Sequence, residues 1–300
     1  MAELPFVAGP VGAIAPATAL AGVAAAAWAL PEPVLVRVGM NVIFDAGDVV
    51  LRVGRTTAPA AAAIALAGVL ESNGIRVPRA AHWEAMTRDG LSVSAWERLV
   101  LVEQPVDWPA IGTMVARVHA LPVDAVPAEY PVPPCESFPW WQLDDLLDDV
   151  GPDVDPTARA GLRATVERHR GWADRGRGDG DDRVVCHGDV HPGNVAMTAA
   201  GPVLLDWDLL CRGPAGWDHA PLLRPGRWGW PTSWYDGFAA GYGRSLVGEP
   251  VTEAIADLRL VAATLLRVRA ARLDPSARAE VERRLAYWRA DRSAATWTAA

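Results

Sequence analysis

The chain has 300 residues, of which 51% are hydrophobic and 21% are charged, and its formal net charge is −8. This composition excludes a disordered chain, and the length allows one large domain or two lobes with a substantial core. The acidic balance argues against a nucleic-acid partner, and three cysteines without a CxxC pair are typical of a reduced, cytoplasmic protein.

The first long apolar stretch, residues 6–30, must be tested as a membrane or signal element. It lacks a basic leading segment, contains Pro10 and Pro16, and consists mostly of alanine and glycine, which insert weakly into membranes. We therefore expect a buried or surface helix over residues 17–29, stopped by the prolines that follow, and no membrane partner.

Short β-type runs separated by turn signals come next. The succession of such runs and turns, together with the hairpin signal at residues 45–48, predicts an antiparallel sheet. Its strands are expected at residues 34–38, 42–44, 49–53, 91–95 and 99–102. A helix is expected over 59–72, because Asn73-Gly74 is a typical C-terminal stop.

From Trp108 onward the pattern is mainly helical. Helices are predicted from residue 108 to about 121 and at 140–150, 156–173, 233–246, 252–272 and 276–291, with loops at 122–137 and 175–182. The fold class is therefore α+β with two lobes. A small antiparallel β-sheet lobe covers residues 1–102, with a hinge at about 95–102, and a larger, mostly α-helical lobe covers 103–300.

Two apolar strands with polar residues at their ends form the centre of the second lobe. The first ends in a loop that holds His187, Asp189 and Asn194, and the second delivers Asp206 and Asp208. Phosphoryl transfer needs a carboxylate near the attacking hydroxyl, and Mg²⁺ prefers oxygen ligands. Asp189 is the candidate base, Asn194 and Asp206 are candidate Mg²⁺ ligands, and His187 is placed to brace the loop.

The sequence His-Gly-Asp-Val-His-Pro-Gly-Asn at 187–194, with Leu-Asp-Trp-Asp at 205–208, resembles the aminoglycoside phosphotransferase family. That family is similar to choline and homoserine kinases and shares the two-lobed protein-kinase-like fold. The resemblance implies that Asp189 is the catalytic base, that Asn194 and Asp206 bind Mg²⁺, and that Asp208 is a secondary metal, structural or substrate-side residue.

The resemblance also implies a nucleotide site for ATP or GTP between the lobes, formed by Asn41, Arg52, Glu97 and Leu99. Arg52 stands where many kinases have a strand lysine that pairs with phosphates, and this chain has no lysine. Kinases hold that lysine with a glutamate in the next helix, but the only acid of this helix, Glu71, is near its end. Either another acid orients Arg52, or nucleotide binding is weak, or the protein has changed role.

On the substrate side, the resemblance points to Asp218, in a segment whose acid commonly holds the loop or faces the substrate. The acids of residues 144–149 lie at i,i+4 spacing and repel each other, so they either await a cation or form a solvated helix face. Tryptophans are abundant in the same lobe and either stack on a substrate or pack in the core. The relevant ones are Trp140, Trp141, Trp217, Trp228, Trp230 and Trp234.

We therefore predict an ATP- or GTP-dependent and Mg²⁺-dependent O-phosphotransferase. Its acceptor is expected to be a small, hydroxylated, possibly cationic molecule such as an aminoglycoside, an amino sugar or an amino alcohol, and antibiotic resistance is one possible role. The alternative is a nucleotide- or ligand-binding pseudokinase with a regulatory or scaffolding role, suggested by the missing helix glutamate.

Overall fold

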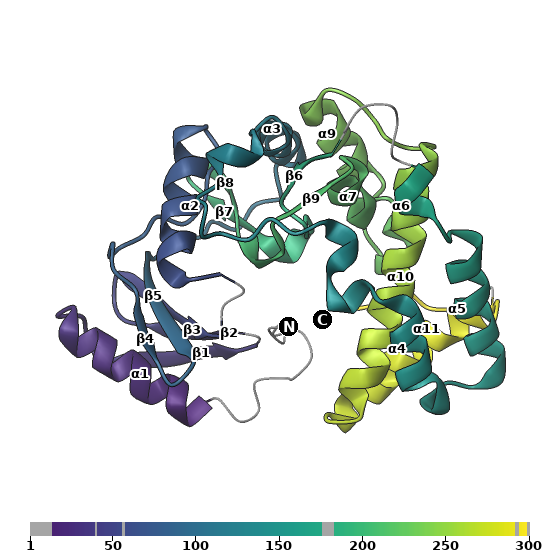
Figure 1. Ribbon diagram of the computed structural model, residues 1–300, viewed down its shortest axis with the longest axis horizontal. Coiled ribbons are helices and arrows are strands. Elements are labelled where there is room, and N and C mark those ends of the chain that lie inside the picture. Colours follow the sequence, from purple (N-terminus) through teal and green to yellow (C-terminus); the bar gives the residue numbers. More distant parts are fainter. Residues whose placement is uncertain (1–13, 40, 56–57, 176–182, 292–293, 299–300) are drawn as a thin grey trace.

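The computed structural model describes residues 14–39, 41–55, 58–175, 183–291 and 294–298. It has the two lobes expected from the sequence, one built on strands and one mostly helical (Figure 1). The predicted α+β fold class is confirmed. The beginning of the apolar N-terminal stretch, Met40 of the first turn and most of the loop expected at 175–182 lie outside the described residues.

A five-stranded antiparallel sheet with the order β1-β2-β3-β5-β4 forms the first lobe. Its strands are β1 (Val34–Val38), β2 (Asn41–Asp45), β3 (Val49–Gly54), β4 (Met86–Arg88) and β5 (Leu91–Glu97). The strands predicted at 34–38, 42–44, 49–53 and 91–95 are confirmed to within two residues, whereas β4 was not predicted. β4 spans only three residues, too few for an alternating pattern to be visible.

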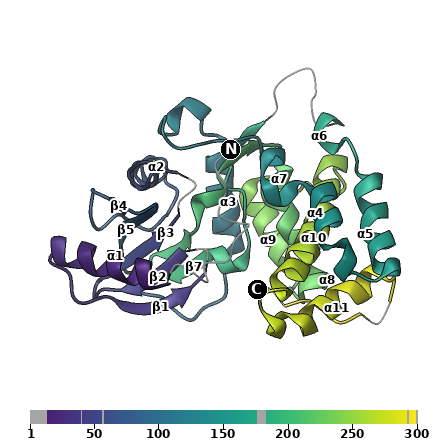
Figure 2. The ribbon, with the colours of Figure 1, turned by 60° about the horizontal axis from the view of Figure 1, so that its bottom comes forward.

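Two helices cover the sheet from opposite sides (Figures 1 and 2). Helix α1 (Ile14–Ala27) packs its buried alanines against the face that carries Leu51 and Val53, and helix α2 (Ala60–Ser72) lies on the other side. Because successive strand residues point to opposite faces, Arg52 points away from α1. This alternation directs the Arg52 side chain towards the second lobe.

The strand predicted at 99–102 is wrong, because these residues link the lobes instead. The N–H of Arg98 donates to the Asp48 carbonyl at 2.9 Å in the first lobe, and the N–H of Val102 donates to the Met197 carbonyl at 2.9 Å in the second. Between them, Val100 is 78% exposed and Leu101 is 67% exposed. The run of apolar residues imitates a strand, but it crosses the surface with one isolated bridge, at Leu101.

The second lobe is organised around the long helix α10. Its helices are α3 (Trp108–His119), α4 (Leu143–Val150), α5 (Pro156–Arg168), α6 (Trp172–Arg175), α7 (Gly216–His219), α8 (Pro225–Trp228), α9 (Ser233–Tyr242), α10 (Pro250–Ala271) and α11 (Arg278–Trp288). All the predicted helices of this lobe are found; most of them are shorter than predicted, whereas α10 begins two residues earlier. The helix predicted to begin at Trp140 begins at Leu143, because residues 139–141 form a 3₁₀ turn.

Two short antiparallel strand pairs carry the central motif of this lobe. Strand β6 (Val184–Cys186) pairs with β9 (Cys211–Gly213), and β7 (Val195–Thr198) pairs with β8 (Gly201–Leu204). Helices α3 and α9 lie between the sheet of the first lobe and α10 (Figure 2). Among the described residues, no helix is both long and apolar enough to cross a membrane.

Candidate active site between the two lobes

The loop after β6 is held in shape by its own histidine. His187 is fully buried; its Nε2 donates to the Leu205 carbonyl at 3.0 Å, and its Nδ1 accepts from the N–H of Asp189 at 3.2 Å. Burial lowers the pKa of His187 and keeps the ring neutral, which suits one donor and one acceptor nitrogen. His187 therefore joins the loop to the end of β8, in the bracing position expected for it.

Gly188 is required by the geometry of the same loop. Its φ is +95°, and a Cβ atom at this position would lie 2.0 Å from the Leu209 carbonyl oxygen. A residue with a side chain would suffer both backbone strain and a collision with main-chain atoms. The glycine thus allows the loop to pass directly over the segment that follows β8.

Asp218 of helix α7 holds the main chain of the loop by hydrogen bonds. Its carboxylate accepts from the N–H groups of His187 and Gly188, both at 2.8 Å, and from His119 Nε2 at 3.0 Å. The side chain is fully buried, so it offers no surface to a substrate. We therefore correct its expected role from substrate contact to support of the loop.

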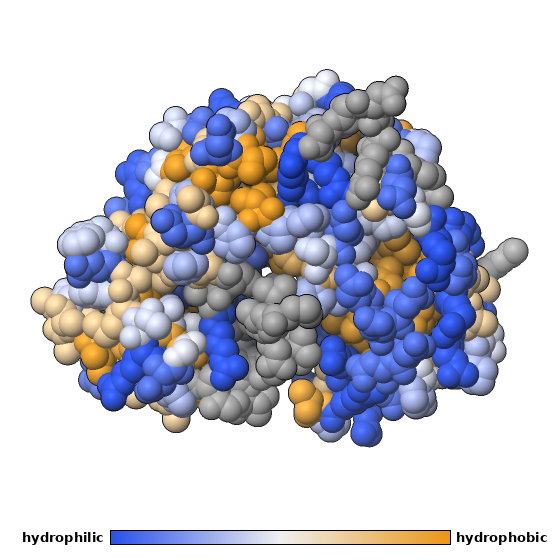
Figure 3. Space-filling model, viewed as in Figure 1, coloured by the Kyte–Doolittle hydropathy of each residue, from blue (hydrophilic) through white to orange (hydrophobic). Residues whose placement is uncertain are grey.

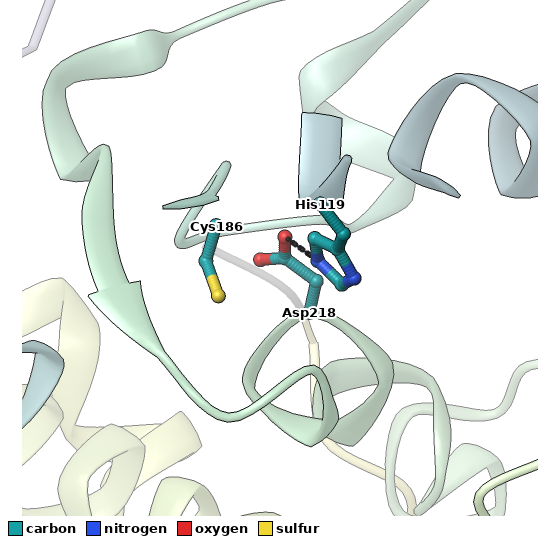
Figure 4. Close-up of side chains that lie close together, drawn as sticks. All are labelled: His119, Cys186 and Asp218. Carbon is teal, nitrogen blue, oxygen red and sulfur yellow. Dashed lines mark hydrogen bonds and ion pairs between the residues drawn. The ribbon is translucent and has the colours of Figure 1, made fainter. Parts of the chain in front are cut away.

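His119 and Asp218 form a buried ion pair, with the thiol of Cys186 beside it (Figure 4). Burial alone would lower the pKa of His119, but the hydrogen bond that it donates to Asp218, together with the contact of Cys186, raises it to about 9. The ligand atoms of the three side chains lie within 4.8 Å of one another, yet the carboxylate oxygens already accept main-chain hydrogens. The cluster is therefore occupied by internal hydrogen bonds and holds α3, α7 and the loop together.

Asp189 faces the cavity with a fixed orientation. Arg259 Nη2 donates to its Oδ1 at 2.9 Å, and His191 Nε2 lies 3.3 Å from its Oδ2. Burial would raise the pKa of Asp189, but the charges and hydrogen bonds of His191 and Arg259 hold it well below its usual range. Arg259 also donates to the Gly188 carbonyl at 3.0 Å, so it fixes both the side chain and its backbone.

The predicted metal ligands lie next to Asp189. The N–H of Leu205 donates to the Asn194 carbonyl at 2.9 Å, which brings the end of β8 against the loop, and Asn194 Nδ2 donates to the Asp189 carbonyl at 2.9 Å. Asp206 follows with φ +61°, a conformation that few non-glycine residues adopt. Asn194 and Asp206 thus flank the candidate base.

The donor set of this corner fits Mg²⁺. Asp206 Oδ1 is buried and, within the described part of the chain, has no hydrogen-bond partner. Burial and the neighbouring charge of Asp208 raise the pKa of Asp206, which is the behaviour of a carboxylate that lacks enough positive charge. A hard cation held by Asp206 and by the amide oxygen of Asn194 would satisfy that atom.

Arg52 finds its acidic partner in the other lobe. It forms a close ion pair and hydrogen bond with Asp208 and lies 3.6 Å from Asp206 Oδ1. Burial would lower the pKa of Arg52, but Asp208 and Asp206 raise it. Glu71, the only acid of α2, pairs with Arg79 instead. Of the three possibilities left open by the sequence, the structure supports the first, in which another acid orients Arg52.

Of the other residues expected at the nucleotide, one lies beside Arg52 and two do not. The Asn41 amide lies against Arg52 and Asp208, and its oxygen accepts from Arg52 Nη2 at 2.7 Å in the orientation that suits both groups. Glu97 is exposed at the end of β5, and Leu99 is half-buried in the segment that links the lobes. Only Asn41 is therefore brought together with Arg52 and the metal corner.

A cavity of about 490 Å³ adjoins Asp189 in the second lobe. Trp140, Trp228 and Trp230 line it, whereas Trp141 and Trp217 belong to the buried core and Trp234 packs against Trp108. All six tryptophans therefore pack in or against the core clusters, and three of them also face the cavity.

The acidic face of α4 is neutralised by arginines rather than left open. Asp144 pairs with Arg170, Asp148 with Arg163, and Asp149 with two further arginines. On the face seen in Figure 3, hydrophilic side chains cover most of the helical lobe. These contacts favour the solvated helix face over a site for a cationic substrate.

Arg259 is the functional residue that the sequence did not indicate. It lies in the middle of α10, 70 residues after Asp189, and its guanidinium lies 5.4 Å from the Trp217 ring centroid and 5.6 Å from that of Trp140. An arginine in an amphipathic helix is usually a surface residue, so no local pattern marks it. Only the packing of α10 beneath the loop identifies it.

Comparison with known proteins shows the family of the chain. Residues 41–256 match the model of the phosphotransferase enzyme family, which is more than half of the chain. The chain therefore belongs to this family, and it is a kinase-like phosphotransferase that acts on small molecules. No curated protein sequence matches it.

Solved structures share the fold at low sequence identity. A spectinomycin phosphotransferase bound to ADP and spectinomycin is 15% identical, with a TM-score of 0.64 over 86% of this chain and 89% of that chain. An amicoumacin kinase bound to AMP-PNP and Ca²⁺ is 14% identical, with a TM-score of 0.66 over 92% and 94%. A choline/ethanolamine kinase family protein from Mesorhizobium loti is 17% identical, with a TM-score of 0.60 over 87% and 88%.

Proposed function

We propose that the chain transfers the γ-phosphoryl group of ATP or GTP to a hydroxyl group of a small molecule, with Asp189 as the base and Asn194 and Asp206 as Mg²⁺ ligands. The observation that carries the proposal is the convergence of these three side chains. Asn194 Nδ2 lies 3.3 Å from Asp189 Oδ2, and the buried Asp206 Oδ1 beside them has no hydrogen-bond donor within the described residues.

The electrostatics of Asp189 define how it would act. A carboxylate with a lowered pKa is a weak base, but phosphoryl transfer passes through a loose transition state that requires positioning more than early proton removal. With Arg259 and His191 fixing its two oxygens, Asp189 would accept a hydrogen bond from the acceptor hydroxyl and take its proton late.

The nucleotide side supports the same reaction. Arg52 points from the sheet towards Asp206 and Asp208, which supports a role of its guanidinium in neutralising phosphate charge. A bound Mg²⁺ would neutralise the charge on the transferring group. Solved relatives include complexes with ADP, with GDP, and with AMP-PNP and Ca²⁺, in keeping with ATP or GTP as the donor.

The test is a nucleotide-consumption assay across hydroxylated small molecules, comparing the native protein with Asp189→Asn. We expect the variant to lose about 100-fold or more of the acceptor-dependent turnover, the usual contribution of a positioned acid–base group. Asp148→Asn is the matched control, since this acid lies exposed on α4. Turnover that survives in Asp189→Asn would overturn the assignment of the base.

The pseudokinase alternative has lost the observation that suggested it, because Asp208 supplies the acid that α2 lacks. Thermal-shift measurements with nucleotide and Mg²⁺ discriminate the two readings. Stabilisation without turnover of any hydroxylated compound would favour the pseudokinase.

A further inference from the structure

The cavity beside Asp189 has mostly apolar and aromatic walls. Trp140 lies at the end near Asp189, and Trp228 and Trp230 stack on each other with ring centroids 5.6 Å apart. Helix α10 adds further apolar side chains, among them Leu260 and Leu266. Binding in such a cavity is favoured when apolar surface is buried and is opposed when a charged group loses its water.

The charged residues of the cavity are nearly all positive. Arg224, Arg259, Arg267 and Arg284 line it, and Asp189 is the one carboxylate among the described lining residues. Arg259 already pairs with Asp189, so a polycationic acceptor would find no unpaired carboxylate among the described lining residues. The lining therefore offers no counter-charge to the aminoglycoside-like acceptors that were expected from the sequence.

Three of the four arginines are committed to protein partners. Arg224 pairs with Asp257 and Glu253, and Arg259 pairs with Asp189. Arg284 donates to Glu280 and to the carbonyls of Ala263 and Thr298, and it also lies over the Trp228 ring. Through these contacts the guanidinium groups of the three arginines stabilise the walls of the cavity.

Arg267 differs from the other three. It is half-buried on α10, lines the cavity, and makes no hydrogen bond or ion pair with any residue in the described ranges. The charge of Arg267 contributes to the lowered pKa of Asp274, but neither that carboxylate nor any other in the described ranges forms a hydrogen bond or an ion pair with it. A half-buried guanidinium in this position is suited to bind an anion.

The spacing of residues along α10 sets the length of the molecule that would carry this anionic group. Arg259 contacts Asp189, and Arg267 follows it by eight residues, a rise of about 12 Å along the helix axis. A molecule that reaches from Asp189 to Arg267 must therefore have a body on the order of 10 Å long. The tryptophans and leucines line the same cavity as those two residues.

We propose that the acceptor is an elongated, largely apolar molecule that presents its hydroxyl group to Asp189 and a carboxylate or similar anion to Arg267. This inference rests on the proposed function, since it names the substrate class of the same site. A bidentate pair between Arg267 and the carboxylate fixes one end, and the apolar walls exclude water from the body. The hydroxyl is then held at Asp189, where phosphoryl transfer takes place.

The test uses three matched probes, namely 10-hydroxydecanoate, its methyl ester and 10-aminodecan-1-ol. Binding is measured by titration calorimetry without nucleotide, and phosphorylation is measured separately with nucleotide and Mg²⁺. We expect the carboxylate to bind about tenfold more tightly than the ester and the amine, as one charged hydrogen-bonded contact would give. In Arg267→Gln that advantage should disappear while ester binding is retained, and in the exposed Arg163→Gln it should persist.

The outcomes separate this inference from the proposed function. Equal binding of the three probes, tighter binding of the amine, no carboxylate binding, or an unchanged preference in Arg267→Gln would overturn the anionic acceptor. If the ester or the amine is nevertheless phosphorylated, the proposed function stands without it. Selective carboxylate binding through Arg267 with no phosphorylation of any probe would support the anion site and count against phosphoryl transfer.

Discussion

Removing the charge of His119 should make stability less dependent on pH. The pKa of His119 is about 9 in the folded chain, compared with 6.5 for a free histidine, because the contacts of Asp218 and Cys186 together outweigh the effect of burial. At about 1.4 kcal/mol for each pKa unit, this difference corresponds to about 3 kcal/mol. The lowered pKa of Asp218 describes the same contact from its other side, so it is not added.

The sign follows from linkage. A group whose pKa is raised on folding contributes its full stabilisation below the unfolded value of 6.5 and loses it as the pH rises through about 9. Urea unfolding at pH 6 and at pH 9.5 should therefore show that the native chain loses about 3 kcal/mol more than His119→Gln between these two conditions.

The matched control is His82→Gln, which alters a histidine stacked on Trp28 outside this pair. It should keep the native pH dependence of the free energy of unfolding. If His119→Gln instead loses as much stability between pH 6 and 9.5 as the native chain does, the ion pair with Asp218 does not support the loop electrostatically.

Three further changes test other parts of the site. Arg52→Gln should raise the nucleotide KM at least about tenfold, since it removes a charge-assisted phosphate contact, and steady-state kinetics would show it; an unchanged KM would place the phosphates elsewhere. Gly188→Ala should lower the free energy of unfolding by at least about 2 kcal/mol. The left-handed backbone alone costs an alanine about 1–2 kcal/mol, and its Cβ would collide with the Leu209 carbonyl. Urea unfolding measures this change, and an unchanged free energy of unfolding would contradict the loop geometry. Arg259→Gln should lower kcat and move the acid limb of the pH–rate profile to higher pH, because Asp189 loses a partner that holds its pKa down; a limb that stays in place would separate Arg259 from the base.

The sequence predicted those parts of the molecule that depend on neighbouring residues. The strands at 34–38 and 49–53 are short β-type runs next to turn signals. The loop from His187 to Asn194 carries its hydrogen-bonding groups within one short segment. Local pattern is enough for such features. It failed at 99–102, where an apolar run is exposed because the chain must cross between two lobes.

Contacts between distant segments could not be predicted in the same way. Asp208 meets Arg52 across 156 residues, and Arg259 meets Asp189 across 70. Neither the acid nor the arginine is unusual in its own segment, so the pairing follows only from how the lobes and α10 pack. The sequence showed that Arg52 lacked its usual partner, but the structure was needed to identify the replacement.

Two sets of contacts hold different parts of the loop that carries Asp189. Asp218 and His187 fix the backbone of the loop from within the core, while Arg259 fixes the carboxylate of Asp189 from the side of the cavity. Arg259 also lies against Trp140 in the wall of that cavity. A change in how an acceptor packs against this wall can therefore alter the orientation of Asp189 directly. With Asp189 as the proposed base, this guanidinium group would couple acceptor binding to the alignment of the base, so a molecule that packs poorly should lower kcat as well as raise KM.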